Sequence, residues 1–132
     1  MTGQANSEIN PKTSSELAGK VAIVTGAGRM RGIGRGTATV LARMGAHVVV
    51  TGTGRSPDTY PDDEKKAGWR DIQSTAEEVE SYGVRSLALV VNVADEDDVQ
   101  RMIDATLAEF GRIDIIVNNA AAPLGGDRVA VL

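Results

Sequence analysis

Four short apolar runs, each rich in valine, isoleucine or leucine, constrain the fold of this chain most strongly. They occupy residues 20–25, 47–51, 86–91 and 113–118. Runs of this length and composition predict strands that are buried on both faces. Strands of that kind are typical of parallel sheets with helices packed on both sides.

Between the runs, apolar residues recur at helical spacing and predict three helices. The first ends near Gly45, the second is expected from Trp69 to Gly83, and the third begins at the N-cap Asp95 and ends at Gly111. Residues 52–68, rich in glycine, proline and charge, are expected to form a long loop. The order βαβαβαβ predicts an α/β fold of the Rossmann type, an open parallel sheet with helices on both faces and strand order 3-2-1-4.

Composition excludes several function classes. The chain has 132 residues, enough for one domain, and contains no cysteine, so disulfides, thiolate zinc sites and cysteine nucleophiles are ruled out. Fourteen basic residues against 18 acidic ones argue against a nucleic-acid partner. No apolar run reaches the roughly 18 residues that span a bilayer, so we expect a cytoplasmic protein without a membrane partner. Residues 1–18 are polar and predict a flexible tail before a domain at 19–132.

A glycine-rich turn, residues 25–34, joins the first strand to the first helix. Glycines at this place let a phosphate approach the N–H groups at the start of the helix, so the turn predicts nucleotide or cofactor binding. A P-loop is excluded because no lysine lies between Lys20 and Lys65. The common dinucleotide spacing also fails, since three residues separate Gly28 from Gly32 where that pattern has two.

The turn reads Thr25-Gly26, five residues, then Gly32-Ile33-Gly34, and Asn118-Asn119-Ala120-Ala121 closes the fourth strand. In both motifs the chain resembles the short-chain dehydrogenase/reductase family, from about residue 17 to residue 124. The resemblance implies a nicotinamide cofactor and hydride transfer to or from an alcohol or carbonyl substrate. Three departures stand out: the spacer of residues 27–31 is two residues longer than in the family's main branch, Asn92 replaces an aspartate beside the adenine, and Ala121 replaces a glycine.

The cofactor preference follows from charge near the second strand. Position 18 after Gly34 is Gly52, so the carboxylate that holds the ribose 2′-hydroxyl in NAD sites is missing there. Arg31 and Arg55 are expected to flank a 2′-phosphate, which favours NADP over NAD. The predicted cofactor-binding residues are Gly26, Arg31, Gly32, Ile33, Gly34, Gly52, Thr53, Arg55, Asn92, Val93, Asn119, Ala120 and Ala121.

The catalytic residues implied by the resemblance, a serine and a tyrosine followed four residues later by a lysine, are missing. Glu64 stands four residues after Tyr60, and Ser86 four residues after Tyr82. We therefore expect the cofactor-binding half of an oxidoreductase, with the catalytic segment beyond residue 132 and a homo-oligomer at full length. The isolated chain should self-associate through its fourth strand. The alternative is a stand-alone, non-catalytic NADP-binding module.

Overall fold

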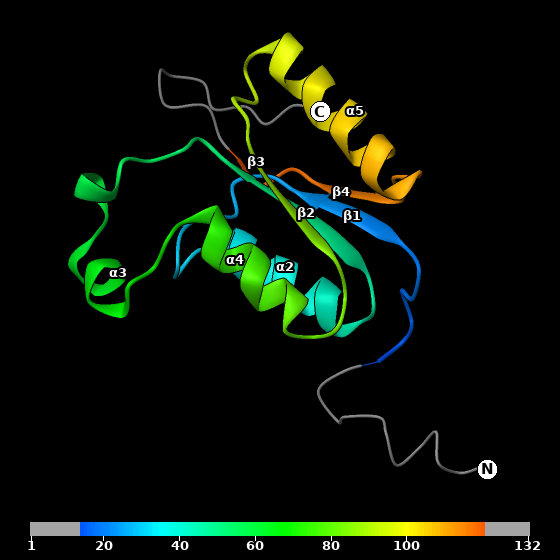
Figure 1. Ribbon diagram of the computed structural model, residues 1–132, viewed down its shortest axis with the longest axis horizontal. Helices are drawn as coiled ribbons and strands as arrows, with labels where there is room; N and C mark the ends of the chain where they lie inside the picture. The colour runs from blue at the N-terminus through cyan, green and yellow to red at the C-terminus, as the bar shows by residue number, and fades with distance from the viewer. Residues whose placement is uncertain (1–13, 121–132) are drawn as a thin grey trace.

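Four parallel strands form one sheet in the order β3-β2-β1-β4 (Figure 1). They span Val21–Val24 (β1), His47–Gly52 (β2), Ser86–Val90 (β3) and Ile115–Val117 (β4) in a computed structural model that describes residues 14–120. In the register, Ile23 of β1 lies beside Val49 of β2 and Ile116 of β4. The predicted fold class, strand order and parallel pairing are confirmed.

Three helices cover the two faces of the sheet. Helices α2 (Ile33–Arg43) and α4 (Ile72–Glu80) lie together on one face, and α5 (Glu96–Phe110) lies on the other (Figure 1). Successive strand residues point to opposite faces of the sheet. Val48 and Val50 pack toward α2 and α4, whereas Val49 packs toward α5. This alternation explains why the strands are apolar at consecutive positions.

The connection from β2 to α4 differs from the predicted long loop. It contains a short 3₁₀ helix, Pro57–Thr59, and the helix α3, Asp62–Ala67. Helix α4 begins at Ile72 rather than at Trp69, because Asp71 has a positive φ of 60° that cannot continue a helix. Trp69 therefore lies outside α4, and the predicted start of this helix is wrong by three residues.

Residues 14–18, assigned from the sequence to the tail, contact the domain. The N–H groups of Ser14 and Leu17 donate to the carbonyl oxygens of Arg43 and Met44, and Leu17 packs against the α2–α4 core. Packing therefore begins before Gly19. The other residues predicted as tail lie outside the described part of the chain.

Strand β4 pairs only with β1 among the described residues, and Ile116 on it is 52% exposed. Self-association through this strand stays a prediction.

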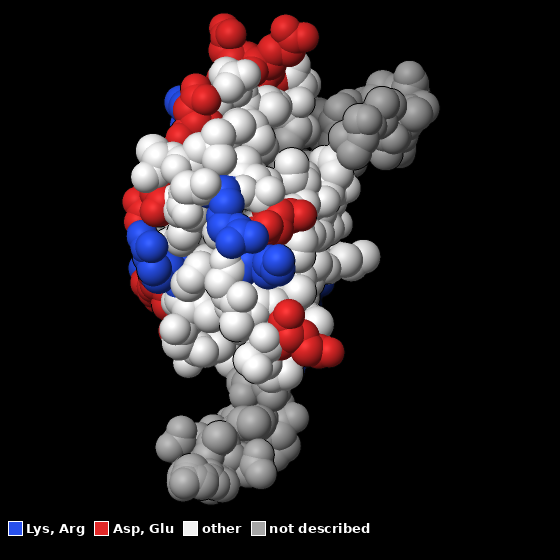
Figure 2. Space-filling view, turned by 90° about the vertical axis from the view of Figure 1, so that its right-hand side faces the viewer, with Lys and Arg blue, Asp and Glu red and all other residues white. Residues whose placement is uncertain are grey.

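Several charged side chains on the surface form ion pairs. Figure 2 shows a small group of basic side chains with acidic ones directly beside it. Ion pairs join Arg85 to Glu109 and Arg112 to Asp114, and solvent-exposed pairs of this kind contribute little to stability. No helix within residues 14–120 is long and apolar enough to cross a membrane.

Candidate functional site

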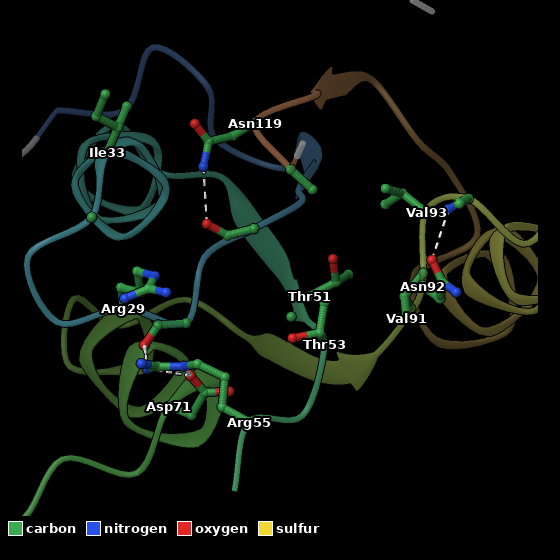
Figure 3. A pocket seen from close by; sticks show the side chains of 16 residues that line it. Arg29, Ile33, Thr51, Thr53, Arg55, Asp71, Val91, Asn92, Val93 and Asn119 are labelled. Carbon is green, nitrogen blue, oxygen red and sulfur yellow. Dashed lines mark hydrogen bonds and ion pairs between the residues drawn. The ribbon is translucent and has the colours of Figure 1, made fainter. Parts of the chain in front are cut away.

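A pocket of about 540 Å³ lies at the carboxyl ends of the four strands (Figure 3). Its walls come from the turn after β1, the end of β2, the segment after β3 and the segment after β4, which is where open α/β sheets bind ligands. The lining residues are Gly26, Gly28, Arg29, Gly32, Ile33, Thr51, Gly52, Thr53, Arg55, Asp71, Val91, Asn92, Val93, Ala94, Asn119 and Ala120.

The N-terminus of α2 faces this pocket without a cap. Its N-cap, Gly32, has no side chain to accept the first N–H groups, and the first turn carries no acidic residue. These N–H groups lack intrahelical acceptors and carry the positive end of the helix dipole. Gly34 lets the helix start close to β1, since a Cβ there would come within 2.3 Å of the Gly26 carbonyl oxygen. The arrangement can bind an anionic group such as a diphosphate.

Thr25 and Asn119 tie the ends of β1 and β4 together. The Thr25 hydroxyl oxygen accepts from the N–H groups of Asn119 and Ala120, both at 3.0 Å. The Asn119 side-chain nitrogen donates to the Gly26 carbonyl at 2.9 Å (Figure 3). Gly26 has a φ of 66°, and a Cβ on it would come within 2.9 Å of the Ala120 backbone. Asn119 thus braces the end of β4 against the end of β1.

A buried charged cluster lies below the end of β2. Arg55, with its side chain 15% exposed, donates to one Asp71 carboxylate oxygen from Nε at 2.9 Å and from Nη2 at 2.6 Å. The same Nη2 lies 3.0 Å from a carboxylate oxygen of Glu64. Burial acts to lower the pKa of Arg55, but hydrogen bonds to and negative charges on Asp71 and Glu64 outweigh burial and raise it. Arg55 therefore stays charged while two carboxylates balance it.

Asn92 follows β3 and is held from both sides. Its N–H donates to a carboxylate oxygen of Asp98 at 2.8 Å, and its side-chain oxygen accepts from the Ala94 N–H at 3.0 Å. Hydrogen bonds from the Asn92 N–H and from Arg101 hold the pKa of the Asp98 carboxyl below its ordinary value. The side-chain nitrogen of Asn92 forms no hydrogen bond within residues 14–120 and can donate to a ligand.

Ten of the thirteen predicted site residues line the pocket. They are Gly26, Gly32, Ile33, Gly52, Thr53, Arg55, Asn92, Val93, Asn119 and Ala120. Gly34 and Arg31 are not among the lining residues, and the Arg31 side chain is 78% exposed and paired with Asp63. Ala121 lies outside the described residues.

Arg29 and Asp71 are pocket residues that the sequence analysis missed. Arg29 is exposed and forms no ion pair with any residue between 14 and 120. Its position inside the glycine-rich turn could have identified it as a pocket residue from the sequence. Asp71 lies 19 residues after Gly52 and reaches the pocket only through its unusual backbone conformation, for which the sequence carried no signal.

The fold and pocket define an α/β protein with an open parallel sheet and a pocket at the carboxyl ends of its strands. A family model described as enoyl-(acyl carrier protein) reductase matches residues 26–129. The chain belongs to the short-chain dehydrogenase/reductase family.

Curated relatives and a solved structure agree with this assignment. The chain is 39% identical over 113 residues to a 12alpha-hydroxysteroid dehydrogenase of a Clostridium species, covering 82% of this chain and 38% of the relative. It is 41% identical over 101 residues to the 3-oxoacyl-(acyl-carrier-protein) reductase FabG of Staphylococcus aureus. That match covers 76% of this chain and 35% of the relative. A Mycobacterium paratuberculosis short-chain dehydrogenase bound to NAD matches with a TM-score of 0.64, 34% identity and coverage of 80% and 38%. The chain thus spans little more than a third of the length of these proteins.

Proposed function

We propose that this chain is the dinucleotide-binding part of an NAD(P)-dependent oxidoreductase that acts on a small alcohol or carbonyl substrate. The observation that carries the proposal is the uncapped N-terminus of α2, which opens into a pocket of about 540 Å³. A bound nicotinamide would supply or accept the hydride. The residues of this chain would bind and orient the dinucleotide.

Each wall of the pocket fits one part of a dinucleotide. The turn and the first N–H groups of α2 would hold the diphosphate, and Asn92 would donate to the adenine from its unpaired side-chain nitrogen. Asn119 and Ala120 would lie beside the nicotinamide ribose. Gly26 lets the turn pass close to the segment after β4, because a Cβ at this position would collide with the Ala120 backbone.

We further propose that NADP is preferred over NAD. Arg29 and Arg55 both line the pocket, and a guanidinium about 4 Å from a phosphate charge contributes roughly 1–4 kcal/mol. Asp71 and Glu64 already balance the charge of Arg55, so Arg29 carries more of this preference. We expect a preference of about tenfold, which corresponds to about 1.4 kcal/mol.

A stand-alone binding module remains the second candidate because neither tyrosine fits a catalytic role. Tyr60 lies against the Arg55 guanidinium, and Tyr82 packs against the core between α2 and α4. Reading the coding DNA after codon 132, together with an intact mass, separates the two candidates. A Tyr-x-x-x-Lys segment in frame supports the enzyme, and a stop codon directly after codon 132 supports the binding module.

Calorimetric titration of the protein with NADPH and with NADH tests the proposal. We expect both to bind, NADPH more tightly, and Arg29→Ala to reduce the difference. Arg85→Ala is the matched control, since Arg85 pairs with Glu109 and does not line the pocket. If neither NADPH nor NADH binds, the proposed function is contradicted. Equal affinities for the two would contradict only the NADP preference.

A further inference from the structure

The turn between β1 and α2 is held by side chains from the connection between β2 and α4. Trp69 Nε1 donates to the Gly28 carbonyl oxygen at 2.7 Å. A carboxylate oxygen of Glu64 accepts from the Met30 N–H at 2.8 Å. Only 3% of the Glu64 side chain is exposed, and a carboxylate that deep in a protein requires such partners.

Other contacts hold further polar groups of the turn. The Ala27 N–H donates to the Thr51 carbonyl, and the Ala27 carbonyl accepts from the buried Thr75 hydroxyl at 2.7 Å. Arg35 donates to the Met30 carbonyl at 2.7 Å. By contrast, the N–H groups of Gly28 and Arg29 form no hydrogen bond within the described part of the chain, and both residues line the pocket.

We propose that Glu64 and Trp69 are positioning residues for the diphosphate-binding turn, an inference that rests on the proposed function. A turn of five residues has many conformations, and fixing one of them costs free energy. Glu64 and Trp69 remove that cost from binding because they hold Gly28 and Met30 in place beforehand. The two residues therefore keep the N–H groups of Gly28 and Arg29 available to the diphosphate.

Arg55 makes this arrangement compatible with an anionic ligand. It lies between Glu64 and Asp71 and compensates one of the two negative charges that would otherwise repel a diphosphate. Asp71 occupies the N-cap position of α4 but forms no cap bond, and its carboxylate bonds to Arg55 instead. Its positive φ is strained for a residue other than glycine, and strain of this kind gathers at functional sites.

Titration with two ligand fragments, ADP-ribose and adenosine, tests the inference, because only ADP-ribose contains the diphosphate. We expect Glu64→Met and Trp69→Phe each to weaken ADP-ribose about tenfold, as the loss of one buried hydrogen bond implies, with adenosine changed less than twofold. Glu64→Gln should recover most of the affinity, since its amide oxygen accepts from the same Met30 N–H. Glu80→Met is the matched control on an exposed position of α4.

The double variant sharpens the test. Since both side chains act on one turn, the combined loss in Glu64→Met/Trp69→Phe should be smaller than the product of the single losses. The positioning role is overturned if both single variants bind ADP-ribose as tightly as the unaltered protein does. It is also overturned if their affinity for adenosine falls as much as their affinity for ADP-ribose. If Glu64→Met does not fold, Trp69→Phe alone decides. Should the unaltered protein bind no ADP-ribose, the proposed function fails instead.

Discussion

Two helix N-termini at the same edge of the sheet are built in opposite ways. At α5, the Asp95 side chain accepts from the N–H groups of Asp97 and Asp98, and three acidic residues fill the first turn. At α2, Gly32 provides no cap and the first turn has no acidic residue. Capping and acidic residues stabilise a helix start.

If the proposed function holds, this difference separates a helix start that serves stability from one that serves binding. The α5 terminus satisfies its own donors and gains helix stability from them. The α2 terminus leaves its donors to the pocket, and the surrounding protein holds the adjacent turn in place through Trp69, Glu64 and Thr75. A binding site of this kind depends on side chains that are distant in sequence, whereas the cap of α5 is local.

The strongest way to break the comparison is to give α2 the cap that α5 has. Gly32→Asp would place a carboxylate over the donors of α2, and its repulsion of a diphosphate at about 4 Å costs roughly 1–4 kcal/mol. We expect about a 100-fold loss of NADPH affinity by calorimetry, with folding stability within about 0.5 kcal/mol. Gly32→Asn caps without charge and should lose less. Unchanged binding by Gly32→Asp would show that the α2 terminus does not hold the diphosphate.

The converse change removes the cap of α5. Asp95→Ala should lower the free energy of unfolding by about 1 kcal/mol, since N-cap residues contribute about 0.5–2 kcal/mol. NADPH affinity should stay within twofold. Denaturant unfolding gives the first value and titration the second. A larger effect on affinity than on stability would contradict the division between the two termini.

Acid should act on the α5 side of the pocket. Bonds from the Asn92 N–H and from Arg101 lower the pKa of Asp98, so its stabilising contribution is complete above the unfolded pKa near 4 and is lost as pH falls through the lower folded value. The melting temperature, measured from pH 7 to pH 2, should decrease once the pH is lower than about 4. Asp98→Asn should flatten this decline, and an identical decline in that variant would remove Asp98 from the account.

The smallest effect is expected at Arg31. This side chain is mostly exposed, pairs with Asp63 and does not line the pocket, so Arg31→Ala should change stability by less than about 1 kcal/mol. The affinity for NADPH should change less than twofold in a calorimetric titration. A selective loss of NADPH over NADH affinity would instead restore the role that the sequence assigned to Arg31.

The sequence predicted the parts of the fold that depend on periodicity. Consecutive apolar residues in the strands predicted a parallel sheet with helices on both faces, and Asp95 predicted the start of α5. Helix α3 was missed because its residues, Asp62–Ala67, contain no apolar stripe. Trp69 was misplaced because it stands three residues before Ile72, at a spacing that imitates a helix face.

The walls of the pocket were predictable where they are backbone and less so where they are side chains. Glycine spacing identified the turn, and the end of each strand identified Gly52, Asn92 and Asn119. The choice between Arg29 and Arg31 depends on which way each side chain leaves the turn, and residue spacing does not encode that direction. Asp71 could not be found because its contact with Arg55 depends on a backbone conformation rare outside glycine.

An NMR titration of the amide signals with NADPH shows whether the N–H groups at the start of α2 bind the diphosphate. We predict that the N–H signals of Gly28, Arg29, Ile33 and Gly34 shift most and reach saturation together. Those of Asp97 and Asp98, which Asp95 already binds, should move little. Saturation of the dinucleotide with the α2 signals unmoved would contradict the account.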